Sequence, residues 1–248
     1  MNSTSTTPGR VAVVTGGSRG IGRQVVERLA ADGYAIVVSY RGNHTEAEAA
    51  VAAARAAGGD AVAIPADVAD QAEVADLFDA TERRFGGVDV VVHAAGMMAL
   101  APLADLDLDQ LDQLLRVNVR GTFAVDQQAA RRVRRGGAII NFSSSLTRFA
   151  RPGYSGYAAS KGAVSAITLV LARELRGRDV TVNAVAPGPT ATGLFLDGKD
   201  EQTLARIAAE PPLERLGTPD DIAELVAFLA GPGRWVNGQV LYANGGAI

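Results

Sequence analysis

Cysteine is absent from this chain of 248 residues, and histidine occurs only twice, at His44 and His93. The chain therefore cannot form a disulfide, a thiolate metal site or a cysteine nucleophile, and it has too few histidines for a histidine-rich zinc site. We expect no metal. Aromatic residues make up 5% of the chain, and the formal net charge is −3. This composition lacks the basic surface and the stacking aromatics of nucleic-acid-binding proteins, so we expect no nucleic-acid partner.

Long apolar runs are missing too, since no uninterrupted stretch approaches the roughly 18–20 residues that cross a membrane. Residues 1–9 are rich in serine and threonine and lack the basic-then-apolar order of a signal peptide. By contrast, 48% of the residues are hydrophobic, which excludes a disordered chain. We expect a globular cytoplasmic protein with a flexible tail over residues 1–9 and no membrane partner.

Short aliphatic runs alternate with longer helical stretches over residues 10–248. Most of these runs are apolar throughout, which indicates strands covered on both faces, as in a parallel sheet. Such repeats predict one α/β domain with a doubly wound, Rossmann-type parallel sheet of about seven strands in three layers. The predicted strands are 10–14, 35–39, 61–65, 88–92, 138–141, 180–185 and 239–243, and the predicted helices are 21–32, 45–57, 71–85, 106–135, 157–176 and 219–230.

The segment 190–216 interrupts this alternation with glycines and prolines around a short helical piece. An insertion after the C-terminal end of a strand is the usual place for a substrate-covering loop in such a fold. We therefore expect a substrate lid at about 190–216.

A glycine-rich turn joins the first predicted strand to the first predicted helix. Free backbone N–H groups and the positive end of the helix dipole favour an anion at such a turn. Gly16 permits the tight turn, Gly20 lets a pyrophosphate approach the backbone, and Gly22 lets the helix pack closely on the strand. No Gly-Lys-Ser/Thr follows, so this is not a nucleoside-triphosphate loop. We favour dinucleotide binding over a ligand-free turn, through Gly16, Ser18, Arg19, Gly20, Ile21 and Gly22.

The same turn also fits Gly-x-Ser-x-Gly, the nucleophile elbow of serine hydrolases. That fold needs strands before the elbow, and an acid and a histidine after it. Ser18 follows the first predicted strand, and the last histidine, His93, lies less than halfway along the chain. The chain order excludes a serine hydrolase.

Tyr157 and Lys161 are four residues apart at the start of a predicted helix, so they lie on one face of it. A nearby ammonium group lowers the pKa of a tyrosine, which makes the tyrosine useful as an acid or base near neutral pH. By itself the pair is more typical of an ordinary helix. The pair points to a catalytic site only in combination with the motifs that accompany it.

Together these motifs resemble the short-chain dehydrogenase/reductase superfamily, in its short single-domain branch, over essentially the whole chain after the tail. The family's T-G-x-x-x-G-x-G turn matches residues 15–22, and its Y-x-x-x-K matches Tyr157 and Lys161. Its catalytic serine, 13 residues before the tyrosine, corresponds to Ser144, and its asparagine corresponds to Asn118. The segment that closes over the nicotinamide carboxamide corresponds to Pro187, Thr190 and Thr192.

One segment departs from the family pattern. Where the family has N-A-A-G, this chain has His93-Ala94-Ala95-Gly96, and the match puts His93 and Gly96 beside the cofactor. Asparagine and histidine can both donate and accept hydrogen bonds, so we expect His93 to be a satisfied buried group.

The resemblance implies that hydride passes from a nicotinamide to a carbonyl carbon. Tyr157 would protonate the carbonyl oxygen, and Ser144 would donate a second hydrogen bond to it, as an oxyanion hole does. Lys161 would lower the pKa of Tyr157 and bind the nicotinamide ribose, and Asn118 would hold a water that links Lys161 to solvent. Tyr157 and Lys161 are thus expected both in catalysis and in cofactor binding.

The end of the second predicted strand bears on the choice of nucleotide. NAD-specific relatives place an aspartate there to bind the ribose hydroxyls, but this chain has Tyr40 and then Arg41. A ribose 2′-phosphate would instead find Arg41, Arg19 and the Ser39 hydroxyl. We therefore expect NADPH (NADP+) rather than NADH, the alternative being a solvated Arg41. By resemblance, Asp67 and Val68 contact the adenine ring.

Few residues of the sequence indicate which substrate the protein binds. Tyr154, Met97, Met98 and residues 194–196 either line an apolar pocket or serve only as packing. The arginine run at 131–135 is expected to end a helix, complement its dipole and stay solvated. Within the family, Arg135 and Arg178 resemble the carrier-protein docking arginines of β-ketoacyl reductases, but such arginines are common in it.

We expect an NADPH-dependent reductase of a small-molecule ketone, or in reverse an alcohol dehydrogenase, with a β-ketoacyl thioester as the narrower guess. The alternative is a non-catalytic NADPH-binding sensor, which would not need Asn118, Ser144, Tyr157 and Lys161 together.

Apolar residues on more than one face of helices 106–135 and 157–176 call for a second partner: Leu111, Leu114, Val125, Ala163, Ile167 and Leu171. In the family these helices pair across a twofold axis, which implies a homotetramer, with a dimer next.

Overall fold

Seven parallel strands form one sheet, in the order β3-β2-β1-β4-β5-β6-β7, in the computed structural model, which describes residues 9–248. The strands are β1 (Val11–Thr15), β2 (Ala35–Tyr40), β3 (Ala61–Pro65), β4 (Val88–His93), β5 (Val133–Phe142), β6 (Thr181–Pro187) and β7 (Gln239–Ala243). The order reverses between β1 and β4, so the carboxyl ends of these two strands form a crevice suited to a ligand. The doubly wound sheet predicted from the sequence is confirmed, whereas the predicted tail, except for Gly9, lies outside the described residues.

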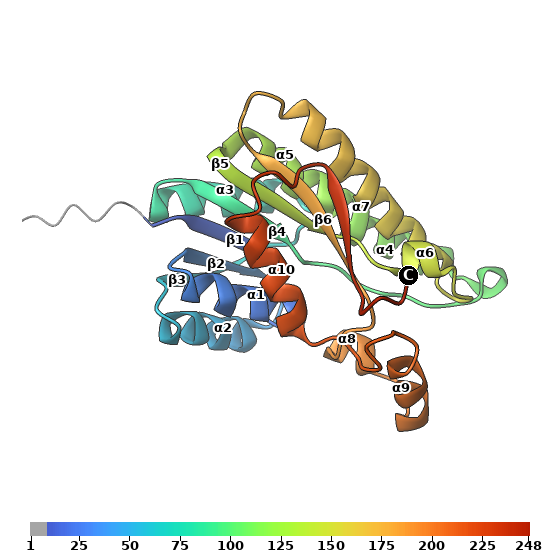
Figure 1. Cartoon of the computed structure of the whole chain (residues 1–248). Helices are drawn as coiled ribbons and strands as arrows, with labels where there is room; N and C mark the ends of the chain where they lie inside the picture. The colour runs from blue at the N-terminus through green and yellow to red at the C-terminus, as the bar shows by residue number, and fades with distance from the viewer. Residues whose placement is uncertain (1–8) are drawn as a thin grey trace, which may run out of the picture.

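Helices cover both faces of the sheet, as Figure 1 shows. One face carries α1 (Gly20–Ala31), α2 (His44–Ala56) and α10 (Pro219–Ala230), and the other carries α3 (Gln71–Phe85), α5 (Gly121–Arg132) and α7 (Ser155–Glu174). Successive side chains of a strand point to opposite faces, so Val14 packs under α1 and Val13 packs under α3 and α5. Leu29 and Phe78 are fully buried in the two layers, and each such burial contributes about 1.5–3 kcal/mol.

The long helix predicted at 106–135 is observed as one unbroken helical run over residues 108–132, so the prediction is wrong only at its C-terminal end. The chain forms η1 (Leu103–Asp105), then α4 (Leu108–Leu115), one π-helical stretch η2 (Arg116–Arg120), and then α5. Residues 133–135 begin β5 instead of ending the helix. Arg134 is held there because its guanidinium forms an ion pair with Asp89 of β4, with Nε to Oδ1 at 2.9 Å.

The same contacts correct the prediction that the arginine run stays solvated. Arg132 forms ion pairs with Asp79 and Glu82 of α3, the second at 2.9 Å, and Arg134 is bound to Asp89. These arginines therefore tie α5 and β5 to their neighbours. The other predicted elements start and end within about two residues of the observed ones, apart from the earlier start of β5.

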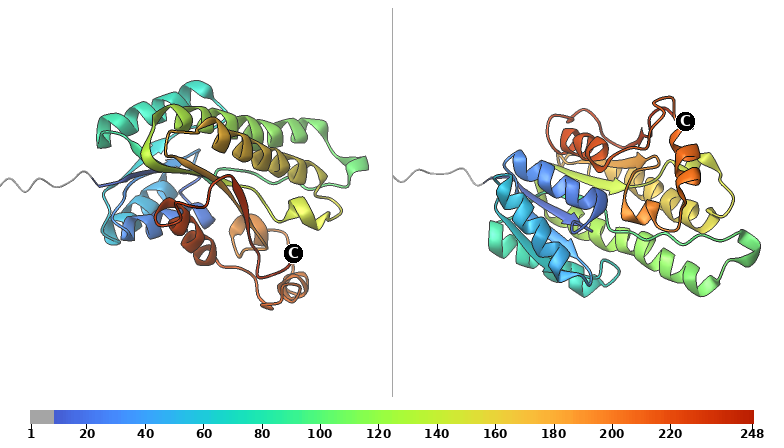
Figure 2. Two further views of the ribbon diagram at one scale, coloured as in Figure 1. Left: turned by 45° about the horizontal axis from the view of Figure 1, so that its top comes forward. Right: turned by 90° about the horizontal axis from the view of Figure 1, so that it is seen from below.

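Residues 190–216 contain two short helices, α8 (Gly193–Leu196) and α9 (Glu201–Ala208), and the short α6 (Leu146–Phe149) follows β5. In both views of Figure 2, α9 lies beside the C-terminus of the chain. A Cβ placed on Gly245 would lie 3.1 Å from Pro211, which shows how closely the two segments pack. Within residues 9–248, no helix is long and apolar enough to cross a membrane, and no group of His, Asp and Glu side chains is arranged to hold a metal ion.

Candidate functional site

The four predicted catalytic residues meet at the carboxyl ends of the central strands. Ser144 lies two residues after the end of β5, Tyr157 and Lys161 share a face of the first turns of α7, and Asn118 lies in η2. They come together because α7 packs against β5, β6 and η2. Three segments separated in sequence thus contribute to one cluster, as the motif spacing indicated.

Lys161 is buried, with 6% of its surface exposed. Its Nζ donates a hydrogen bond to the Phe142 carbonyl at 2.8 Å and lies 5.9 Å from the centre of the Tyr157 ring. Burial lowers the pKa of Lys161 to about 8, because a charged ammonium is costly away from water. The amine is therefore poised to gain or lose a proton near neutral pH.

The pKa of Tyr157 moves in the opposite direction from our expectation. Burial raises the pKa of Tyr157 to about 12, a hydrogen bond with Ser144 acts to lower it, and nearby Tyr154 acts to raise it. In the chain by itself burial thus outweighs any effect of Lys161 on the phenol. Tyr157 is accordingly protonated at neutral pH.

Asn118 links three segments around the catalytic helix. Its Nδ2 donates to the Met97 carbonyl at 2.9 Å and to Ser160 Oγ at 3.0 Å, and its Oδ1 accepts from the Met97 N–H at 2.9 Å. Both of its N–H donors are used by protein, so the side chain fixes the strand-end loop. A Cβ on Gly96 would lie 3.3 Å from Asn118 Oδ1 and 3.5 Å from Lys161 Nζ. Because glycine has no side chain, the space beside these two atoms stays open.

The glycine-rich turn has the geometry of an anion cradle. Gly16 has φ +66°, and a Cβ there would lie 2.8 Å from the Ala95 nitrogen; a Cβ on Gly22 would lie 2.2 Å from the Gly16 oxygen. Helix α1 begins without a side-chain cap and without an acid in its first turn, which leaves its first N–H groups free for an anion. Ser18 is half-buried, Ile21 lies in the first turn, and Arg19 and Gly20 are exposed. These residues fit a bound pyrophosphate.

Of the side chains predicted to surround a 2′-phosphate, some are exposed and others are buried. Arg41 is exposed, and its Nε lies 3.7 Å from Asp67 Oδ2. Tyr40 instead packs in the core under α1 and α2, where its hydroxyl is 2.8 Å from His44 Nδ1. Ser39 Oγ is buried without a hydrogen-bond partner in the described chain. The ring of Tyr40 is thus used for packing, and contact between Tyr40 and the cofactor remains a prediction.

The loop after β3 is held against η2. Arg116 Nη1 donates to Asp67 Oδ2 at 3.0 Å, and a Cβ on Gly121 would lie only 2.9 Å from Val68. Burial alone would raise the pKa of Asp67, but the Ala69 N–H, Arg116 and the charge of Arg41 together lower it. Arg116 was not among the residues predicted from the sequence. Nothing local marks it, since its partner is 49 residues away.

His93 ends β4 and is 2% exposed. Its Nδ1 lies 2.8 Å from Thr15 Oγ1, which also accepts from the Ala95 N–H at 3.3 Å, so His93 helps to fix the strand-end loop. Burial, aided by the charge of Lys161, lowers the pKa of His93 to about 3. The predicted burial is confirmed. Full hydrogen bonding is not, because Nε2 has no partner among residues 9–248.

The segment after β6 reaches the glycine-rich turn. Pro187 ends the strand, and buried Thr190 donates from Oγ1 to the Gly188 carbonyl at 3.0 Å. The side chain of Thr192 lies 3.6 Å from the position a Cβ would take on Gly20. The beginning of the predicted lid thus borders the candidate pyrophosphate site.

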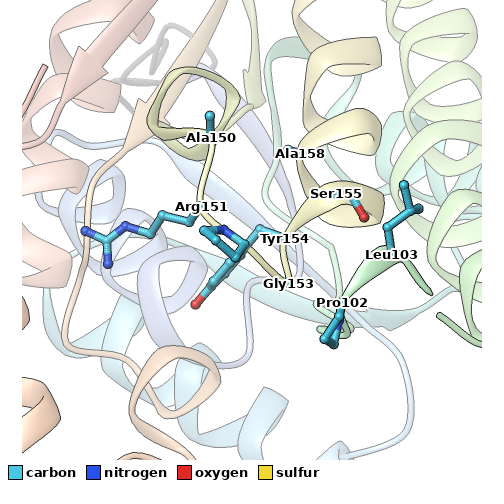
Figure 3. Close-up of a pocket in the computed structure, with 9 residues that line it drawn as sticks. Pro102, Leu103, Ala150, Arg151, Gly153, Tyr154, Ser155 and Ala158 are labelled. Carbon is cyan, nitrogen blue, oxygen red and sulfur yellow. The ribbon is translucent and has the colours of Figure 1, made fainter. Parts of the chain in front are cut away.

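A cavity of about 410 Å³ opens at the start of α7 (Figure 3). Tyr154 lines it, whereas Met97, Met98 and residues 194–196 do not. Arg151 extends away from Leu103 in Figure 3, and its guanidinium forms an ion pair with Glu210, just after α9. The cavity is lined by Pro102, Leu103, Ala150, Arg151, Pro152, Gly153, Tyr154, Ser155 and Ala158.

Known proteins share both this sequence and this structure. A family model described as Enoyl-(Acyl carrier protein) reductase matches residues 16–247. A short-chain type dehydrogenase/reductase of Picea abies is 44% identical, with 97% of this chain and 93% of that protein covered. An NADPH-dependent aldehyde reductase-like protein of Arabidopsis thaliana, described as chloroplastic, is 40% identical, with coverages of 97% and 94%. A short chain dehydrogenase from Burkholderia cenocepacia, solved in complex with NADP, has a TM-score of 0.90, 42% identity and coverages of 96% and 97%.

Proposed function

Because the chain belongs to the short-chain dehydrogenase/reductase family, we propose that it is an NADPH-dependent carbonyl reductase. It reduces a ketone to a secondary alcohol and, in reverse, oxidises the alcohol. This proposal rests mainly on one observation. Tyr157, Ser144 and Lys161 lie together beside the space left by Gly96, next to the glycine-rich turn that can bind an anion. A protein that only senses a nucleotide would not need a proton donor and its partners there.

NADPH, when bound, supplies the hydride. Tyr157 holds its proton at neutral pH, since burial raises the pKa of Tyr157 to about 12, and it donates this proton to the carbonyl oxygen. Ser144 stabilises the same oxygen through its hydroxyl. As Tyr157 gives its proton to the carbonyl oxygen, its own side chain would become a phenolate. Lys161, with a pKa of about 8, offsets that charge and returns a proton from solvent.

The cofactor is proposed to lie along the crevice from α7 to β2. The glycine-rich turn binds the pyrophosphate, Asp67 and Val68 border the adenine, and Arg41 with Arg19 receives the 2′-phosphate. His93 and Gly96 border the nicotinamide, Tyr157 and Lys161 its ribose, and Pro187, Thr190 and Thr192 its carboxamide. The NADP complex of the Burkholderia cenocepacia relative and the name of the Arabidopsis thaliana relative support NADPH over NADH.

We assign the substrate to the cavity at the start of α7, covered by residues 190–216 as a lid. The ion pair between Arg151 and Glu210 joins the loop before α7 to the end of α9, so it holds the lid against the cavity wall. The apolar side chains of Leu103 and Pro102 favour a ketone with a hydrophobic substituent.

A carrier-bound β-ketoacyl thioester is the narrower possibility. Arg135 donates to the Gly177 carbonyl at 3.1 Å, and Arg178 donates to the carbonyls of Ala130 and Val133. Both guanidinium groups thus already have a structural role, so a free small-molecule ketone is the preferred substrate and no carrier protein is required.

We propose a homotetramer, with a dimer as the alternative. Of the residues predicted to be shared, Leu114, Val125 and Leu171 are used within the chain itself. Other apolar residues are exposed on the same helices and near the last strand: Phe123, Leu169, Val170, Phe228 and Trp235. Their exposure supports burial between copies. Light scattering at micromolar concentration is expected to give the tetramer mass, and a monomer would refute the proposal.

The decisive experiment is a screen of NADPH oxidation across ketones, aldehydes, β-keto esters and acyl thioesters, read by nucleotide absorbance. Turnover with at least one class, lost in Tyr157→Phe, supports the reductase. Tight NADPH binding without turnover on any class would favour the sensor. Cell fractionation tests the cytoplasmic location that the sequence predicts.

A further inference from the structure

Three charged side chains from three separate segments meet at the adenosine end of the crevice. Asp67 follows β3, Arg41 follows β2, and Arg116 begins η2. Both arginines approach the same carboxylate oxygen, Asp67 Oδ2, with Arg116 Nη1 at 3.0 Å and Arg41 Nε at 3.7 Å. One carboxylate is therefore shared by two guanidinium groups.

The two arginines hold that carboxylate unequally. Arg116 donates a hydrogen bond of ordinary length, whereas Arg41 forms only a long ion pair, and its side chain is 65% exposed against 39% for Arg116. Exposed ion pairs of this kind contribute little to stability, so Arg41 can leave Asp67 at little energetic cost. Arg116 is therefore the arginine that remains bound to Asp67.

Arg116 is also the better anchored of the two. Arg120, one turn later, donates from Nε to the Ala69 carbonyl at 3.0 Å, and Gly121 packs closely on Val68. One side of η2 and the start of α5 thus runs along residues 67–69. This contact keeps the Arg116 guanidinium beside Asp67 whatever Arg41 does.

The shared carboxylate matters for any phosphate that binds Arg41. Asp67 is 13% exposed and carries a negative charge at neutral pH, so on its own it would repel a phosphate nearby and compete with it for Arg41. A cation bound to Asp67 cancels both effects. Because charges at such partly buried positions interact over several ångströms, the compensation is felt at Arg41.

We propose that Arg116 is a positioning residue for recognition of the 2′-phosphate: it remains on Asp67, neutralises it, and so frees Arg41 for the phosphate. This inference rests on the proposed NADPH function and on the assignment of the 2′-phosphate to Arg41. Arg116 acts through Asp67 and makes no contact with the phosphate.

The test measures binding of two fragments by calorimetry, adenosine 2′,5′-bisphosphate and adenosine 5′-monophosphate. Both contain the adenine, so the ratio of their dissociation constants isolates the 2′-phosphate. Arg116→Gln is expected to reduce the preference for the bisphosphate about five- to tenfold. Asp67→Asn alone is expected to raise that preference, and Asp67→Asn with Arg116→Gln to restore at least the wild-type value.

Arg120→Gln is the matched control, since it removes a neighbouring guanidinium that holds the same loop without touching Asp67. It is expected to leave the preference within about twofold of wild type. An unchanged preference in Arg116→Gln overturns the inference, as does a double variant that stays as weak as the single one, which would show direct contact with the phosphate. If Arg41→Ala leaves the preference unchanged, the underlying 2′-phosphate assignment fails instead. If Arg41→Ala abolishes it and Arg116→Gln does not, only this inference fails.

Discussion

The two ends of the crevice handle charge in opposite ways. At the catalytic end, Lys161 is 6% exposed and bonded to a backbone carbonyl, and burial shifts the pKa values of Lys161 and Tyr157. At the adenosine end, the Arg41 side chain is 65% exposed and pairs with another charge. Burial changes how readily a group gives up a proton, whereas exposed charges attract an ion and are screened by salt. On the proposed assignments, we therefore expect that the chemistry and the choice of nucleotide can be altered separately.

The largest effect is expected at the buried end, from Tyr157→Phe. The ring and its packing remain, but the proton donor is lost, a role worth about 10²–10⁴ in rate. Turnover of any active ketone should fall by that factor while NADPH affinity, measured by fluorescence titration, changes less than about twofold. Activity within a few-fold of wild type would remove Tyr157 from the proposed mechanism.

A second test concerns the buried layer beneath the catalytic end. Asn141 Nδ2 donates to Asp126 Oδ2 at 2.9 Å and to Thr168 Oγ1 at 3.1 Å, and Asn141 lies in register with His93. Burial raises the pKa of Asp126 from 3.8 to about 7, a displacement that corresponds to about 4 kcal/mol. A raised folded-state pKa stabilises the protein fully below the unfolded value, and this stability is lost as the pH rises through about 7.

Asp126→Asn mimics the protonated carboxyl, so it should remove this dependence. Relative to the variant, wild type is expected to lose up to about 4 kcal/mol of unfolding free energy between pH 4 and pH 8, measured by urea denaturation. His93, whose pKa is lowered to about 3, acts with the opposite sign below its ordinary value of 6.5 and is common to both proteins. Parallel stability curves for the two proteins would show that Asp126 is charged in the fold.

A smaller effect is expected at the exposed end, from Arg41→Ala. Charge-assisted hydrogen bonds contribute about 1.5–3 kcal/mol, so kcat/KM for NADPH should fall roughly ten- to a hundredfold, while that for NADH is nearly unchanged. NAD-specific relatives have an aspartate at this strand end, but Tyr40→Asp is not the complementary variant, because Tyr40 is 9% exposed and packs under α1 and α2. A wild-type preference for NADH would refute the assignment.

The smallest effect is the response to salt. Raising ionic strength from about 0.05 M to about 0.5 M shortens the screening length severalfold, so KM for NADPH should rise a few-fold while kcat stays level. The buried groups near Tyr157 are shielded from these ions. Arg41→Ala should flatten the salt dependence of KM. Equal salt dependence of kcat and KM would show that the two ends are not separate.

Much of this organisation follows from local sequence. Aliphatic blocks such as residues 61–65 and glycine-rich turns act within a few residues, so most strands and helices were predicted to within about two residues, β5 being the exception among the strands. The pairing of Tyr157 with Lys161 is equally local, since it needs only the helix period. Ser144 and Asn118 required the family resemblance, because nothing in their surroundings marks them.

The features that could not be predicted from the sequence depend on contacts between residues that are far apart in the chain. The strand at residues 133–135 exists because Arg134 binds Asp89, and the inward turn of Tyr40 depends on the packing of α2 on β2. The pKa of Tyr157 depends on burial, which a spacing of four residues does not reveal. The pairing of Arg116 with Asp67 likewise joins two loops that only the order of the sheet brings together.

The π-helical stretch η2 has a consequence for the tolerance of this chain to insertions and deletions. A wider turn holds more residues than an α-turn, and each residue of an α-helix rotates the following chain by about 100°. The wide turn therefore absorbs one residue while α4 and α5 keep their relative rotation. Deleting one residue from 116–120 would restore an α-turn and displace the side chains of the turn itself, so Asn118 would lose its bonds to Met97 and Ser160. We therefore expect natural length variation among relatives to avoid these five positions.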